Sequence, residues 1–198
     1  MELSIDGMHN PSSLPHDLSP ATLRACAAFA GLFAACAALV WAFERPPAPM
    51  LAVSVLLGAG LSLLSGIDVR SYRLPDVLTL PLMLAGVAVA WWLDLAPVWW
   101  RAVSAGISWG LLAAVAALYQ RARGRAGLGM GDAKLLAAAG AWVGAEGLPT
   151  VLLIGAVSAL VLAGAARLAG RAIDGGTRVP FGPFLAFGIW MVWLLGPL

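Results

Sequence analysis

Gly129-Met130-Gly131-Asp132-Ala133-Lys134 is the stretch around which the chain is organised, because it sets an aspartate and a lysine directly before an apolar run. That run begins at Leu135 and is one of several. A second aspartate, Asp68, closes another apolar run and is followed within a few residues by Arg73-Leu74-Pro75-Asp76. Two carboxylates at the ends of two hydrophobic segments indicate acid/base chemistry at a membrane surface.

The composition of the chain is that of an integral membrane protein. Of its 198 residues, 61% are hydrophobic and 11% are charged, and the mean hydropathy is +0.89. Soluble domains contain about 25% charged residues. The net charge of +2 gives no sign of a nucleic-acid partner, and we expect none. The chain therefore has little room for a soluble domain.

The two cysteines, Cys26 and Cys36, both lie in the first apolar run. On one helix they would be roughly 15 Å apart at 1.5 Å per residue, which is too far for a disulfide. No CxxC pair occurs, so the sequence contains no zinc knuckle. We interpret both as small apolar residues of the core, and we expect neither a metal nor a cofactor.

Hydrophobic segments follow one another with short connectors, and most approach the roughly 17–25 residues that cross a bilayer. They predict an all-α, polytopic membrane helix bundle of about seven transmembrane helices (six to seven). The polar residues 1–20 are predicted to be a cytoplasmic tail, and residues 21–198 a single transmembrane domain. The segments are Leu23–Phe43, Met50–Ile67, Val77–Leu93, Ala102–Tyr119, Asp132–Ala145, Pro149–Leu168 and Phe184–Leu195.

The fifth segment is short, and this bears on the position of Asp132. About 14 residues span only about 21 Å, whereas the hydrocarbon core is roughly 30 Å thick. We therefore expect Asp132 to lie below the membrane surface, in a water-filled recess between neighbouring helices.

Basic residues predict the orientation. With seven spans and an inner N-terminus, ten fall in inner loops and only Arg45 and Arg101 in outer loops, as the positive-inside rule requires. This places Asp68 and Asp132 on the same, cytoplasmic side. Seven tryptophans fall near the outer ends, as in an aromatic belt: Trp41, Trp91, Trp92, Trp99, Trp100, Trp142 and Trp193.

Each aspartate also has a structural interpretation. Asp68 could be an interfacial carboxylate paired with Arg70 or Arg73, and Asp132 could cap a helix. Asp76 follows Pro75 where an N-cap belongs, so we expect it mainly to cap. The glycines on either side of Met130 permit an unwound helix entry and a close approach of substrate backbone.

Peptide hydrolysis can use two carboxyl groups, one that deprotonates water and one that donates a proton. Two neighbouring carboxyl groups suit these roles because they share one proton, which leaves one ionised and the other protonated. No HExxH or GxSxG motif is present, and Lys134, the only lysine, is expected beside Asp132. The rival interpretation is a non-enzymatic scaffold or a small transporter, in which the aspartates cap helices or bind cations.

Three motifs together resemble one family. Gly129 to Leu135 is similar to the GxGDxKL motif of the type IV prepilin peptidases, and Ile67-Asp68 with Arg73 to Pro81 resembles their first aspartate motif. Val179-Pro180-Phe181-Gly182-Pro183-Phe184-Leu185-Ala186 is similar to their PFGPFLA signature. The resemblance covers roughly Val53 to the C-terminus. The GxGD element alone also resembles presenilin and signal peptide peptidases, whose other motifs are absent.

The resemblance implies an aspartic endopeptidase of the bacterial inner membrane with Asp68 and Asp132 as its catalytic pair. It implies removal of the short basic leader of prepilins or pseudopilins, after a glycine and on the cytoplasmic side, with pilus or type II secretion machinery as further partners. The residues expected to shape the substrate site are Gly129, Gly131, Lys134, Asp76, Pro180, Phe181 and Gly182.

One departure from the family pattern concerns methylation. Long members carry a cytoplasmic insert with paired CxxC motifs and N-methylate the new amino terminus. The corresponding region here is Glu44–Pro49, only a few residues. The chain thus resembles a short, peptidase-only form.

Overall fold

A computed structural model describes residues 19–44, 46–123, 129–170 and 180–196. Within these ranges the chain is all-α, which confirms the predicted fold class, and it forms α1 (Pro20–Glu44), α2 (Ala48–Ser71), α3 (Asp76–Trp92), α4 (Val98–Arg123), α5 (Met130–Leu168) and α6 (Gly182–Leu195). Most of the tail predicted over residues 1–20 lies outside the described residues, as do Arg125, Arg171 and Arg178 of the predicted inner loops.

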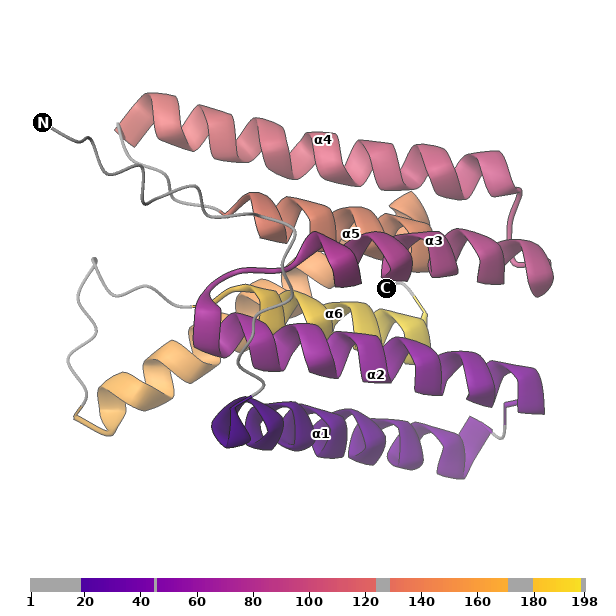
Figure 1. The fold of residues 1–198 in the computed structure, drawn as a ribbon, viewed down its shortest axis with the longest axis horizontal. Helices are drawn as coiled ribbons and strands as arrows, with labels where there is room; N and C mark the ends of the chain where they lie inside the picture. The colour runs from indigo at the N-terminus through magenta and orange to yellow at the C-terminus, as the bar shows by residue number, and fades with distance from the viewer. Residues whose placement is uncertain (1–18, 45, 124–128, 171–179, 197–198) are drawn as a thin grey trace, which may run out of the picture.

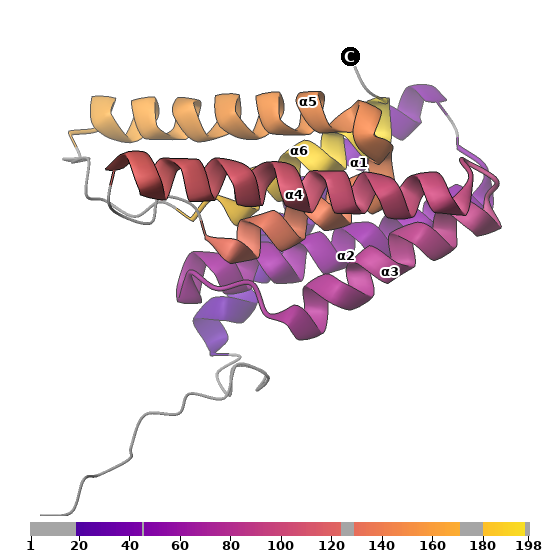
Figure 2. The ribbon, with the colours of Figure 1, turned by 90° about the horizontal axis from the view of Figure 1, so that it is seen from above.

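Helix α5 covers two predicted segments, Asp132–Ala145 and Pro149–Leu168, and a kink divides it close to their junction. Gly144 inside it has φ 78° and ψ 170°, which is not helical, and a positive φ is a conformation that glycine adopts without strain. Figure 2 shows that the arm after this kink runs back toward the end at which α5 begins. The described residues form six helices, one of them kinked, so the count of seven is not confirmed and the number of membrane crossings stays a prediction.

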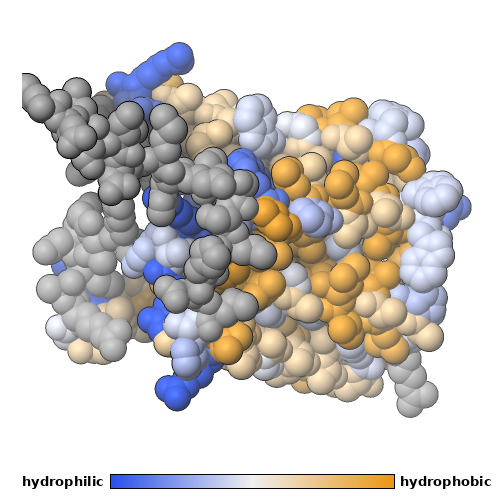
Figure 3. Space-filling model, in the orientation of Figure 1, coloured by the Kyte–Doolittle hydropathy of each residue, from blue (hydrophilic) through white to orange (hydrophobic). Residues whose placement is uncertain are grey.

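Four helices are long and apolar enough to cross a bilayer by length and composition: α1, α2, α4 and α5. Helices α3 and α6 are shorter but also apolar. Figure 3 shows a broad hydrophobic surface over most of the bundle, with hydrophilic residues gathered at one end. This distribution fits a bundle whose sides contact lipid and whose polar end contacts water.

Helix α6 is the centre of the core and packs against α1, α2 and α5. Two of its tryptophans are fixed by their indole N–H groups: Trp190 donates to the Phe33 carbonyl at 3.0 Å and Trp193 to Ser54 Oγ at 2.8 Å. On α5, Trp142 donates to the Leu82 carbonyl at 2.8 Å. Each buried ring thus has a partner for its polar atom.

These contacts correct the predicted aromatic belt. Trp142 and Trp193 are only 2% and 8% exposed, and their rings meet edge to face. They belong to the core because α6 and the first arm of α5 are enclosed by other helices, which hydropathy alone does not reveal. Trp91, Trp92 and Trp99 are exposed, as belt residues should be.

Four helix ends that matter for function meet at one end of the bundle. The C-terminus of α2 and the N-termini of α3, α5 and α6 all lie at the left of Figure 1, whereas the α1–α2 and α3–α4 connections lie at the right. Residues 68, 76, 132 and 182, far apart in the sequence, are therefore at the same end of the molecule.

The orientation can be tested on α4, whose 26 residues span about 39 Å. In a background without the native cysteines, a single cysteine should be introduced at Pro97 or at Arg123. The cysteine at position 97 should react with a membrane-impermeant maleimide in intact cells, and that at position 123 only after permeabilisation. Reaction of both from the same side would contradict the orientation.

Candidate active site

Asp68 lies in the last turn of α2, which ends at Tyr72 in a left-handed conformation with its N–H bonded to the Asp68 carbonyl at 2.8 Å. The Asp68 side chain is only 5% exposed. Its Oδ2 accepts a hydrogen bond from the backbone N–H of Gly182 at 3.1 Å. A carboxyl group is thus held at the N-terminus of α6, where the helix dipole favours negative charge.

Asp132 is the third residue of α5, and its side chain is 9% exposed. Its carboxylate receives the backbone N–H of the N-cap residue, Gly129, and its own N–H donates to the Gly129 carbonyl at 3.1 Å. The bond from the Gly129 N–H to the Asp132 carboxylate is one half of a capping box, and the other half is missing because glycine has no side chain. The structural interpretation of Asp132 as a residue that completes a helix N-terminus therefore has a physical basis.

The two carboxyl groups are nevertheless close enough to interact electrostatically. The negative charge of Asp68 acts on the carboxyl group of Asp132 across the space between α2 and α5. Both groups are buried, at the end of the bundle where α2 ends and α5 begins (Figure 1). Burying two like charges near each other is costly unless they share a proton or bind a partner, so the arrangement suits proton exchange.

Gly182 and Gly131 are glycines because neighbouring atoms leave no room for a side chain. A Cβ at Gly182 would lie 2.6 Å from Asp68 Oδ2, and a Cβ at Gly131 would lie 3.0 Å from the Cβ of Leu74. Gly131 is inside the first turn of α5, so the unwound helix entry predicted for this segment is not present. Leu74 closes over Gly131, a contact that the sequence motif containing Leu74 does not predict.

The contacts predicted for Asp76 and Lys134 were wrong: Asp76 does not cap α3, and Lys134 does not pair with Asp132. The N-cap of α3 is Pro75, with no side-chain cap, and Asp76 is the first helical residue. Its Oδ1 pairs with Lys134 Nζ at 2.5 Å. Lys134 therefore contacts Asp76 and not Asp132, because residues two apart on a helix point in nearly opposite directions.

Pro180 and Phe181 come directly before α6, and Phe181 is its N-cap. The Phe181 carbonyl accepts the N–H groups of Phe184 and Leu185, each at 3.1 Å, and its ring packs against the core. These contacts orient the start of α6 so that the next N–H, that of Gly182, is free to reach Asp68. Their predicted contact with substrate stays a prediction.

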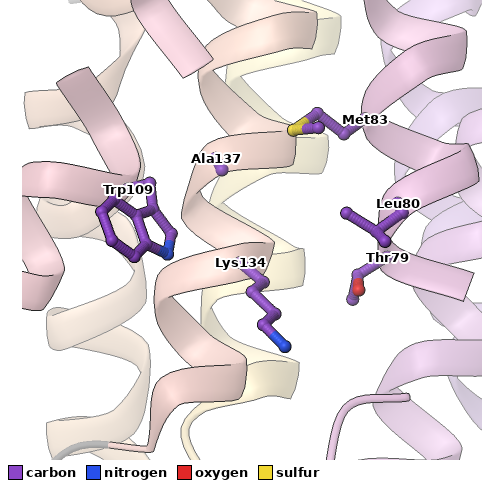
Figure 4. Close-up of a pocket in the computed structure, with 6 residues that line it drawn as sticks. All are labelled: Thr79, Leu80, Met83, Trp109, Lys134 and Ala137. Carbon is purple, nitrogen blue, oxygen red and sulfur yellow. The ribbon is translucent and has the colours of Figure 1, made fainter. Parts of the chain in front are cut away.

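A groove of about 230 Å³ runs beside this end of α5. Figure 4 shows its lining, which comes from α3, α4 and α5: Thr79, Leu80, Met83, Trp109, Lys134 and Ala137. The lining is mostly apolar, with the Lys134 side chain extending from α5 toward α3. Trp109 is 45% exposed and faces this groove.

The carboxyl pair falls inside a match to a known family. The sequence profile of the type IV leader peptidase family matches residues 55–164, more than half of the chain and both aspartates. The chain belongs to the type IV leader peptidase family. This confirms the resemblance found in the sequence motifs.

Members of the type IV leader peptidase family with curated sequences are also similar to the chain. The prepilin leader peptidase/N-methyltransferase of Xanthomonas campestris pv. campestris is 38% identical over 143 residues, covering 72% of this chain and 50% of that protein. The protein of the same name from Burkholderia pseudomallei is 42% identical over 132 residues, covering 67% of this chain and 42% of that protein.

A third relative with that name, from Pseudomonas aeruginosa, is 37% identical over 142 residues, covering 72% of this chain and 49% of that protein. The chain thus matches about half the length of these leader peptidase family members. No solved structure matches it.

Proposed function

We propose that this chain is a membrane-embedded aspartic endopeptidase that removes the leader from prepilins or pseudopilins. The observation that supports the proposal is the burial of Asp68 and Asp132 at the same end of the bundle, with the charge of Asp68 acting on the Asp132 carboxyl. Membership of a leader peptidase family supplies the class of substrate. No metal or organic cofactor takes part in the proposed reaction.

In the proposed mechanism one carboxylate removes a proton from a water molecule, which attacks the carbonyl carbon of the scissile peptide bond. The other carboxyl group donates a proton as the tetrahedral intermediate forms and breaks. The carbon–nitrogen bond cleaves, the leader leaves as a carboxylic acid and the pilin keeps the new amine. Asp68, held by the Gly182 N–H, and Asp132, held by the Gly129 N–H, are pre-oriented for this exchange.

The proposed site faces the cytoplasm, at the inner membrane. The bias of basic residues toward one set of loops supports this side. The substrate is an apolar membrane segment preceded by a short basic leader, with a glycine before the cut. Gly129, Gly131, Pro180, Phe181 and Gly182 would line the path of the scissile bond.

Co-expression in cells tests the proposal against the rival of a non-enzymatic scaffold or transporter. The chain should be expressed with candidate prepilins, and the substrates should shift to the size of the mature form on gels. A scaffold predicts no shift with any candidate, and it also predicts that Asn is tolerated at Asp68 and Asp132.

A further prediction concerns methylation, because the curated relatives named above are also called N-methyltransferases. Only Glu44–Pro49 stands where long members carry their CxxC-containing insert. With this chain as the only added enzyme, the mature pilin should carry an unmethylated amino terminus. Mass spectrometry of the product decides the matter, and a fully methylated terminus would show that the short form methylates as well.

A further inference from the structure

The two carboxyl groups of the site belong to helices that do not pack against each other. Among the described residues, α2 and α5 have no direct backbone contact, and α3 and α6 each contact both of them. The separation of Asp68 and Asp132 must therefore be set by what joins α2 to α5 at this end. On the α6 side that link is the Gly182 N–H, which binds Asp68.

On the α3 side the link is the short connection that follows Asp68. It leaves α2 at Tyr72 and enters α3 at Asp76, and it docks on the first two turns of α5 at two points. Leu74, which is buried, packs on Gly131. Asp76 then pairs with Lys134 at 2.5 Å. Gly131 directly precedes Asp132 in the sequence, and Lys134 follows Asp132 two residues later.

The Asp76–Lys134 ion pair can position the α2–α3 connection on α5, but it adds little to the stability of the fold. The Lys134 and Asp76 side chains are 34% and 46% exposed, and ion pairs with that exposure stabilise a fold only slightly. A small displacement of reacting groups, in contrast, has a large effect on rate. Figure 4 shows the Lys134 side chain extending from α5 into the space toward α3.

We propose that Asp76 and Lys134 form a positioning pair, which docks the α2–α3 connection on α5 and so sets the separation of Asp68 from Asp132. This inference rests on the proposed function and changes the role of both residues from substrate contact to support of the catalytic pair. The pair itself exchanges no proton with the substrate.

Kinetics of three variants test the proposal: Asp76→Asn, Lys134→Met and the double variant. Each single change should lower kcat about ten- to hundredfold, while KM stays within about twofold of wild type. The double variant should be no slower than the slower single variant, because both changes break one interaction. A rise in KM with kcat unchanged would instead make Lys134 or Asp76 a substrate contact and overturn the proposal.

Glu146→Gln is the matched control. Glu146 also joins two helices, because it accepts the Trp100 indole N–H at 3.2 Å and its charge acts on the buried Arg101 of α4, but at the opposite end of the bundle. Its replacement should leave kcat unchanged. A loss in kcat equal to that of Asp76→Asn would show that any weakened helix contact slows the enzyme, which contradicts a specific positioning role.

A distance measurement separates this inference from the proposed function. Spin labels on cysteines introduced at Arg70 and Met130, both exposed, report the separation of the end of α2 from the start of α5. The distance distribution should broaden in Asp76→Asn and Lys134→Met. If the distribution broadens in the variants but the wild type cleaves no prepilin, only the proposed peptidase function is refuted. If the distribution is unchanged in the variants, the positioning role of the ion pair is overturned.

Discussion

Asp68→Asn and Asp132→Asn should each reduce leader cleavage by about 10³-fold or more. Asn keeps the size of Asp and accepts the same backbone hydrogen bonds, so the N–H groups of Gly182 and Gly129 stay satisfied. Only the titratable group is lost. Cleavage rates of purified variants in lipid vesicles, at equal amounts of inserted protein, measure the effect.

The two losses should not add, because residues that act as one unit give grossly non-additive effects. The double variant should be about as inactive as either single variant. The wild-type rate should fall at both ends of the pH range, since one carboxyl must be ionised and the other protonated. Cleavage by Asp68→Asn at nearly the wild-type rate would mean that Asp132 has another catalytic partner.

Gly182→Ala should cause the second-largest loss of activity. A Cβ at this position would lie 2.6 Å from Asp68 Oδ2 and 3.0 Å from its carboxyl carbon, closer than real Cβ contacts come. Asp68 or the start of α6 must move, and either shift breaks the Gly182 N–H contact. A displacement near 1 Å in a catalytic group costs about 10²-fold, and this loss should appear in kcat.

Gly110→Ala is the control for that prediction. Gly110 is also a helical glycine, in α4, but a Cβ there meets no atom within 4 Å. Because alanine favours helix over glycine, the variant should be fully active and at least as stable as wild type. Equal activity of Gly182→Ala and Gly110→Ala would show that the approach of α6 to Asp68 is unimportant.

Hydropathy and motif spacing predicted the all-α membrane bundle, because apolar segments of bilayer length have few alternative structures. They also indicated that Asp68 and Asp132 end up at one end of the bundle, since the positions of helix ends follow from the order of the segments. The kink at Gly144 lies close to the junction of two predicted segments, but its geometry was not predictable, because a glycine in the sequence does not reveal its φ.

Side-chain partners were less predictable. Lys134 was expected beside Asp132 because they are close in sequence, yet helix geometry turns it toward Asp76 on another helix. Asp76 was expected to cap α3, but Pro75 holds the N-cap position. Trp142 and Trp193 were assigned to the interface, and their burial depends on which helices enclose them. Such contacts follow from the packing of distant segments, on which local patterns carry no information.

The central claim is that this chain by itself hydrolyses a prepilin leader with Asp68 and Asp132. The most direct measurement is intact-mass analysis after purified protein, in lipid vesicles, is incubated with a purified prepilin. The wild-type protein should yield two products, the free leader and the mature pilin, whose masses sum to that of the prepilin plus one water. Asp132→Asn should leave the prepilin whole. Equal product from wild type and Asp132→Asn, or none from wild type with any prepilin tested, would contradict the claim.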